Sequence, residues 1–254
     1  MRGARVLLGK EMLEITRTWR FWVLPAIMVF VGISSPVLAK LTPALLSSLT
    51  TDQPGLVIEI PDPVTIDAYL QFTKNSAQLV LIAVIISVAG MIVSEKRAGT
   101  AAIVLTKPVS RSAMVVAKVA SNWALLLAST LLGAALCVGM TALLFDVEHV
   151  RDFAVSVLLW LLLAAMYVAC MAFFSVLIGS QGGAAGAGIG LYLVIAILSS
   201  WGPGRDYTPA GLLSAGDRMM LGESVEVLWP VLTAFGIAIL ATVAAAALFE
   251  RQEL

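Results

Sequence analysis

Long uncharged runs dominate the pattern of hydrophobic and polar positions along the chain. Five of them lie between charged residues, at 21–39, 75–94, 119–145, 153–204 and 227–249. About 20 apolar residues in a helix cross the hydrocarbon core of a bilayer, so four of the runs fit one span each. The fourth run is too long for one span, and Gly179-Ser180-Gln181-Gly182-Gly183 breaks it in two. The pattern therefore predicts six transmembrane helices, at about 21–39, 76–94, 120–145, 153–177, 184–201 and 228–249.

These runs are continuously apolar, whereas the strands of a membrane barrel alternate apolar and polar residues over about ten positions. A helix also satisfies its backbone amides within its own segment, as lipid requires. We therefore predict an all-α membrane protein. The first run, 21–39, ends near Val37-Leu38-Ala39, which loosely fits a signal-peptide cleavage site. The run is longer than the roughly 7–15 apolar residues of a signal peptide, so we interpret it as a retained span.

The segment 1–20 has an amphipathic pattern. Its apolar residues recur at alternating steps of four and three and so share one helical face: Leu8, Met12, Ile15, Trp19 and Trp22. Off that face lie the polar residues Lys10, Glu11, Glu14 and Arg17. We predict an amphipathic helix that lies along the membrane interface. This helix is either a generic membrane-surface anchor or one that also contacts a cytoplasmic partner.

Composition agrees with a membrane protein. Hydrophobic residues make up 60% of the 254 residues and charged residues 13%. In soluble domains about 45–50% of the residues are apolar and about 25% are charged. The 16 basic and 16 acidic residues give a net charge of zero. This balance excludes a strongly basic nucleic-acid binder and a strongly acidic disordered chain.

The distribution of the charges predicts the orientation. If the N-terminus is inside, the six spans place eleven of the 16 basic residues on the inner side and five on the outer side. Lysine and arginine in short loops mark the cytoplasmic side of membrane proteins. We therefore expect both termini in the cytoplasm and the protein in the cell membrane.

Two outer loops are longer than the others. Residues 40–75 contain four prolines and glycines between 54 and 63 and are acidic, which fits either a lid over an exit path or a solvated connector. Residues 202–227 begin with Gly202-Pro203-Gly204 and contain apolar residues that fit short interfacial or re-entrant helices.

The inner loop 94–118 carries the most information. A charged exit from the second span, with Glu95 and Arg97, is followed by Gly99-Thr100 and by a short apolar segment, Ala101 to Thr106. This segment ends before Pro108, since the residue before a proline disfavours helical geometry. A helix this short cannot span a membrane, and a helix this apolar is unsuited to exposure to water. We therefore interpret it as a helix that binds in a groove on a cytoplasmic partner. The alternative is an ordinary basic inner loop.

At this loop the chain resembles the permease subunits of ATP-binding-cassette transporters of the ABC-2 type, which have about six spans and an amphipathic N-terminal helix. The resemblance rests on a charged exit, a Gly-Thr, a short apolar helix, a Pro-x-Ser-Arg and a later Lys. These features correspond here to Glu95, Lys96, Arg97, Gly99, Thr100, Pro108, Ser110, Arg111 and Lys118. Topology extends the likeness over nearly the whole chain.

The resemblance implies that loop 94–118 is a coupling helix docked on an ATPase subunit. The polar contacts expected there are Glu95, Arg97, Arg111 and Lys118, and the docked apolar face is Ala101, Ile103 and Leu105. A smaller contact is expected at residues 178–185. The implied assembly has two permease halves and two ATPase subunits, which bind ATP and magnesium, and it is an exporter. Whether the two permeases are identical stays open.

The sequence lacks several motifs of enzymes and nucleotide-binding proteins. The chain has no Gly-x-x-x-x-Gly-Lys-Ser/Thr loop, no His-Glu-x-x-His and no Gly-x-Ser-x-Gly. We therefore expect neither catalysis nor a cofactor on this chain. The predicted spans also lack the acidic residues that ion-coupled transporters use. That absence favours energy from outside the bilayer and an apolar or amphipathic cargo.

The fifth predicted span begins with regularly spaced glycines. Gly182, Gly186 and Gly190 recur every fourth residue, and small residues at this spacing let membrane helices approach closely. They serve either packing within the chain or a seam between two permeases.

Two rivals to a permease remain. One is a membrane scaffold or sensor that binds a partner without transporting, and the other is an intramembrane enzyme.

Overall fold

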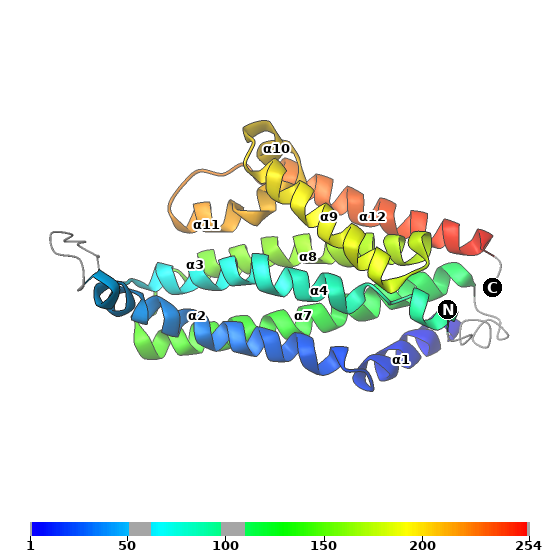
Figure 1. Cartoon of the computed structure of the whole chain (residues 1–254), viewed down its shortest axis with the longest axis horizontal. Helices are drawn as coiled ribbons and strands as arrows, with labels where there is room; N and C mark the ends of the chain where they lie inside the picture. The colour runs from blue at the N-terminus through cyan, green and yellow to red at the C-terminus, as the bar shows by residue number, and fades with distance from the viewer. Residues whose placement is uncertain (1, 51–61, 98–109, 253–254) are drawn as a thin grey trace.

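A computed structural model describes residues 2–50, 62–97 and 110–252, and within these ranges the chain is helical without a β-strand (Figure 1). Six helical stretches of the described residues are long and apolar enough to cross a membrane. They are Phe21–Leu45, Thr65–Arg97, Arg111–Leu144, Val150–Ile178, Gln181–Ser199 and Leu228–Arg251. The predicted all-α class with six membrane helices and a preceding N-terminal helix is confirmed.

The described elements follow one another in this order along the chain. Helix α1 (Arg2–Thr16) precedes α2 (Arg20–Thr50). The second span combines α3 (Thr65–Asn75), the π-helical turn η1 (Ser76–Val80), α4 (Leu81–Val88) and α5 (Val93–Arg97). The third and fourth spans are α7 (Arg111–Leu144) and α8 (Val150–Ile178), and the fifth is α9 (Gln181–Ser199). Three short helices, α10 (Gly202–Tyr207), η2 (Pro209–Leu213) and α11 (Ala215–Met220), precede α12 (Leu228–Arg251).

Several helices extend beyond the uncharged runs of the sequence. Helix α2 continues past Lys40, and the second span begins at Thr65 where the sequence predicted about 76. Much of the predicted 40–75 loop is therefore helical, while 51–61 lies outside the described residues. A long amine side chain can reach out of an apolar environment, so a charge does not have to end a helix. Lys40 does this: its Nζ donates to Leu144 O at 3.3 Å and lies 4.8 Å from the centre of the Phe145 ring.

The break predicted between the fourth and fifth spans lies where the sequence placed it. Gly179 ends α8 with φ +65°, a left-handed conformation that glycine adopts without steric cost. Ser180 then caps α9, because its side chain accepts a hydrogen bond from the backbone N–H of Gly183 at 3.2 Å.

The second span and α8 form the most buried part of the bundle. In the most apolar 18-residue stretch of each, 67% of the residues of the second span and 61% of those of α8 are buried, against 17% in α9 and 17% in α12. Tyr69 of α3 stacks on Phe153 of α8 with the ring centres 4.3 Å apart. Helices α2 and α7 cross at two glycines: a Cβ added to Gly32 would lie 2.4 Å from the carbonyl oxygen of Gly133. This spacing leaves no room for a side chain at the crossing.

The region 202–227 forms the short helices that its sequence suggested, at the end of the bundle opposite α1 (Figure 1). Helix α11 packs on α8, where Gly216 faces Ser156. The Thr73 hydroxyl of α3 donates to the Asp217 carboxylate of α11 at 2.5 Å. These contacts fix the short helices against the long spans.

Helix α1, α5, the beginning of α7 and the end of α12 lie together at the other end of the bundle (Figure 1). We call this the α1 end. Both flanks of segment 98–109 are located here, and the segment itself lies outside the described residues.

Candidate functional site

A break in the second span brings Glu95 into the bundle at the α1 end. The chain turns at 89–92 between α4 and α5. The buried Ser175 hydroxyl of α8 accepts hydrogen bonds from the backbone N–H groups of Ile92, at 3.2 Å, and Val93, at 3.1 Å. These bonds satisfy amides that the interrupted helix leaves without a helical acceptor. Ser175 thereby fixes α5 and with it the carboxylate of Glu95.

The beginning of α7 places Lys118 opposite. Ser110 caps α7 by accepting from the backbone N–H of Ala113 at 3.2 Å. Two turns later Lys118 points inward between apolar neighbours and is 5% exposed. Its own backbone carbonyl accepts from the side chains of Asn122, at 2.8 Å, and Ser121, at 3.0 Å.

The Lys118 ammonium joins two helices that are distant in sequence. Its Nζ lies 2.9 Å from Glu11 Oε2 of α1 and 2.7 Å from Glu95 Oε1 of α5. Glu11 is 2% exposed and Glu95 7%. Charges this deeply buried are retained only when opposite charges and hydrogen bonds compensate them. The three residues therefore hold α1, α5 and α7 together.

Lys10 and Glu14 of α1 complete this ion cluster on its more exposed side. Lys10 Nζ lies 2.7 Å from Glu14 Oε2, 3.2 Å from Glu11 Oε1 and 3.4 Å from Glu95 Oε1. Burial acts to lower the pKa of Lys10, but the hydrogen bond to Glu14 and the charges of Glu95 and Glu11 together raise it above its ordinary value. Burial acts to raise the pKa of Glu14, but Lys10 and Lys118 hold it below its ordinary value.

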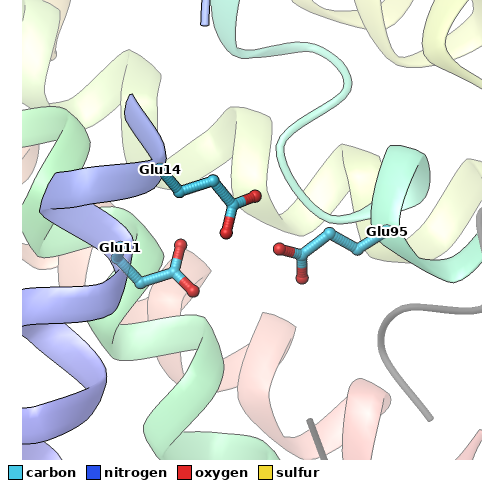
Figure 2. A group of neighbouring side chains, drawn as sticks. All are labelled: Glu11, Glu14 and Glu95. Atoms are coloured by element: carbon cyan, nitrogen blue, oxygen red, sulfur yellow. The ribbon is translucent and has the colours of Figure 1, made fainter. Parts of the chain in front are cut away.

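The three carboxylates of the cluster converge on one point from α1 and α5 (Figure 2). One oxygen from each of Glu11, Glu14 and Glu95 lies within 4.8 Å of the others, a spacing that a metal ion could use. The two ammonium groups already lie 2.7–3.4 Å from these oxygens and supply the compensating charge. We therefore interpret the group as an ion-pair network that joins helices.

The other predicted contact residues lie in different surroundings. Arg97 is exposed and donates to Gly179 O at 3.2 Å, which ties α5 to the turn between α8 and α9. Arg111 donates to Glu250 O at 3.3 Å and also to Gln252 O. Glu95 and Lys118 are turned inward, so neither presents its charge at the surface. Six predicted residues lie outside the described residues: Gly99, Thr100, Ala101, Ile103, Leu105 and Pro108.

The face of α1 that packs on the bundle differs from the predicted apolar face. Ile15 is buried as expected, but Met12 is 40% exposed and Glu11 is buried. Glu11 lies off the apolar face, as the sequence predicted, yet it is buried, because Lys118, 107 residues away, compensates its charge. One signal was present in the sequence: Lys118 interrupts the apolar stretch 113–120, and a buried lysine needs a carboxylate.

The three spaced glycines of α9 do not pack against other residues that the structure describes. Gly182, Gly186 and Gly190 are exposed, and a Cβ added to any of them would meet no atom within 4 Å among the described residues. Gly188 faces inward instead, where a Cβ would lie 2.4 Å from Met171 Sδ and 2.6 Å from Ile85 Cγ2. Helix α9 therefore has one face packed on the bundle and a smooth glycine face turned away from it.

Comparison with known proteins gives two matches. The family described as "ABC-2 family transporter protein" matches residues 5–202, which include the ion cluster, both flanks of segment 98–109 and the glycine face. The chain is also 25% identical over 228 residues to a protein of Bacillus subtilis (strain 168) described as "Uncharacterized transmembrane protein YxlG". That alignment covers 89% of this chain and 88% of the relative.

Proposed function

Because the chain belongs to the ABC-2 family of transporter proteins, we propose that this multi-span membrane protein is the permease subunit of an ATP-driven transporter. A separate ATPase subunit hydrolyses ATP with magnesium, and the permease carries the cargo across the cell membrane. In this proposal the α1 end faces the cytoplasm, in agreement with the excess of basic residues there.

The observation that best supports coupling is the ion cluster at the α1 end. Glu95 precedes segment 98–109 and Lys118 follows it, and Lys118 bonds both Glu95 and Glu11 of α1. A displacement of the segment by a docked ATPase would therefore move α1, α5 and α7 together. A buried ion network suits this role, because a low-dielectric environment strengthens electrostatic contacts between the helices.

In this proposal the ATPase contacts the two flanks of segment 98–109 and the segment itself. Arg97 is exposed and Arg111 is half-buried. In this proposal Ala101, Ile103 and Leu105 fill a groove on the ATPase. The turn at Gly179 lies beside the α5 flank, because Arg97 donates to the Gly179 carbonyl. Glu95 and Lys118 act behind this surface by holding its two flanks.

The glycine face of α9 supports a second permease copy as the neighbour of this helix. The exposed residues Gly182, Gly186 and Gly190 continue into Leu193 and Ile197 at helical spacing, and both are exposed. Small residues permit close backbone approach between membrane helices, and the larger residues extend the contact by dispersion. The transport path would run along this seam and carry an apolar or amphipathic cargo outward.

The docking of the ATPase can be tested with Arg97→Glu in the full chain. We expect at least a tenfold loss of the ATPase subunit that co-purifies with the wild-type chain, since the charge reverses at an exposed flank. Arg205→Glu, at the opposite end of the bundle, is the matched control and should retain the ATPase. Equal recovery of the ATPase with both variants would exclude docking at this flank.

A further inference from the structure

Gln252, the residue that follows α12, contacts two other helices through its side chain. Its Oε1 accepts a hydrogen bond from Lys96 Nζ of α5 at 2.9 Å. Its Nε2 donates to the backbone carbonyl of Val176, near the end of α8, at 3.0 Å. One side-chain amide thus joins α5 and α8 to the end of α12.

The chemistry of these contacts explains why a glutamine suits this position. An amide is both a donor and an acceptor, and here each function has a partner of the opposite kind. A glutamate would still accept from Lys96, but it would have no hydrogen for the Val176 carbonyl at neutral pH. An alanine would make neither contact.

The backbone at the end of α12 contacts the other flank of segment 98–109, which is the beginning of α7. Arg111, the first residue of α7, donates to the carbonyls of Glu250 and Gln252. The residues on either side of segment 98–109 are therefore both attached to 250–252: α5 through the Gln252 side chain and α7 through backbone carbonyls. The ion cluster joins the same two flanks to α1, on a different set of residues.

We propose that Gln252 is a positioning residue that keeps the two flanks of segment 98–109 in register with α8 and α12. This inference rests on the proposed function, in which that segment receives the movement of the ATPase. Through Gln252 the movement reaches the fourth and sixth spans, whereas the ion cluster carries it to α1 and the third span. The two connections together distribute one displacement over α1 and the second, third, fourth and sixth spans.

The contacts themselves are tested by hydrogen–deuterium exchange on the full chain in lipid nanodiscs. Gln252→Ala is expected to speed exchange about tenfold at both 93–97 and 174–178. Gln252→Glu should speed it only at 174–178, because the contact with Lys96 survives. Glu250→Gln is the control: its side chain is exposed and its carbonyl is unchanged. Unaltered exchange in Gln252→Ala would overturn the proposal.

The positioning role needs a readout that stability alone would not change. Spin labels at exposed Ser94 and Arg251, in a chain whose buried Cys137 and Cys170 are replaced by alanine, report the separation of α5 and α12. With the co-purified ATPase and ATP, we expect one narrow distance distribution in the otherwise wild-type chain and a broad one with Gln252→Ala. A narrow distribution in both chains would overturn the role.

These two measurements separate this inference from the proposed function. Hydrogen–deuterium exchange is measured on the chain alone, so it tests the contacts of Gln252 even if no ATPase subunit is recovered. Failure to recover an ATPase subunit would count only against the permease proposal. If the ATPase is recovered and exchange in Gln252→Ala equals the wild type, the permease proposal stands and the role of Gln252 is wrong.

Discussion

Lys118 is a single charge on which the packing of three helices depends. It lies 2.9 Å from Glu11 and 2.7 Å from Glu95, and all three side chains are buried. Removing one partner of a buried ion pair is costly because the remaining charge is left in a poorly solvating environment. Removing Lys118 should therefore cost more stability than removing one partner of a surface ion pair.

We predict that Lys118→Met lowers the free energy of unfolding by about 3–5 kcal/mol. Lys10→Met should lower it by less than about 1 kcal/mol, since the Lys10 side chain is 40% exposed and water screens its contacts. Thermal unfolding of the purified protein in detergent measures both. Equal losses in the two variants would mean that the buried pairs do not hold the helices.

Asp217 gives a prediction on pH at the opposite end of the bundle. Burial raises the pKa of this carboxyl, while the Thr73 hydroxyl and Lys74 act to lower it. The folded state therefore binds the proton more tightly than the unfolded state, and stability falls as pH rises from the ordinary value of about 3.9 through the raised pKa.

We therefore predict that Asp217→Asn melts at a higher temperature than the wild type at pH 7, because the amide oxygen still accepts from Thr73 without a buried charge. The difference should shrink as pH falls towards 4. Melting curves between pH 4 and 8 measure it, and Asp206→Asn, in an exposed position, should show no such trend. A constant difference across this range would contradict the prediction.

The sequence revealed one half of the ion cluster. Glu95 and Lys118 belong to a recognisable pattern around the inner loop, whereas Glu11 lies on a helix whose apolar positions predict a different buried face. Counting apolar residues cannot find a carboxylate that is buried because a lysine far along the chain compensates it. Gln252 was missed for a related reason, since its two partners come from different helices.

At the scale of elements, the crossing of α2 and α7 depends on two glycines. A Cβ on Gly133 would lie 2.8 Å from the carbonyl oxygen of Met28, and the oxygen belongs to the backbone and cannot rotate away. The helices would have to separate to admit a methyl group, which would loosen contacts along both of them.

We predict that Gly133→Ala lowers the free energy of unfolding by about 1–3 kcal/mol, the range for overpacking a close contact. Gly139→Ala is a control on the same helix: a Cβ there meets no described atom within 4 Å. It should be neutral or stabilising, because alanine favours a helix over glycine. Equilibrium unfolding in mixed micelles compares the two. Similar values would show that α2 and α7 do not depend on a close approach at Gly133.

Helix number and type were predictable because the uncharged runs have the length of a bilayer. Helix ends were less predictable, since α2 and the second span continue past charged residues whose side chains reach out of the apolar region. The break inside the second span was also missed. It depends on Ser175, a residue of another helix that accepts from Ile92 and Val93.

At the scale of the whole molecule, α9 has one face packed on the bundle and one exposed glycine face. Gly188 packs on Met171 and Ile85, and Gly186 is exposed with no described atom within 4 Å of an added Cβ. Substitution at these two positions should therefore separate the folding of the chain from its assembly.

We predict that Gly186→Leu leaves the thermal stability of the single chain within about 1 kcal/mol of the wild type, as for a surface change, but weakens self-association at least tenfold. Gly188→Leu should instead destabilise the chain, since it overfills a packed position. Molecular mass by light scattering in detergent, beside melting curves, gives both quantities. Self-association of Gly186→Leu at the wild-type level would place the permease seam elsewhere.

The contact between Glu11 and Lys118 also has a consequence for biosynthesis. A ribosome that adds about 5–20 residues per second needs roughly 5–20 s to cover the 107 residues between them. During that interval Glu11 has been made but its buried partner has not. Helix α1 is synthesised before α7, yet it can dock in its final place only after α7 has begun.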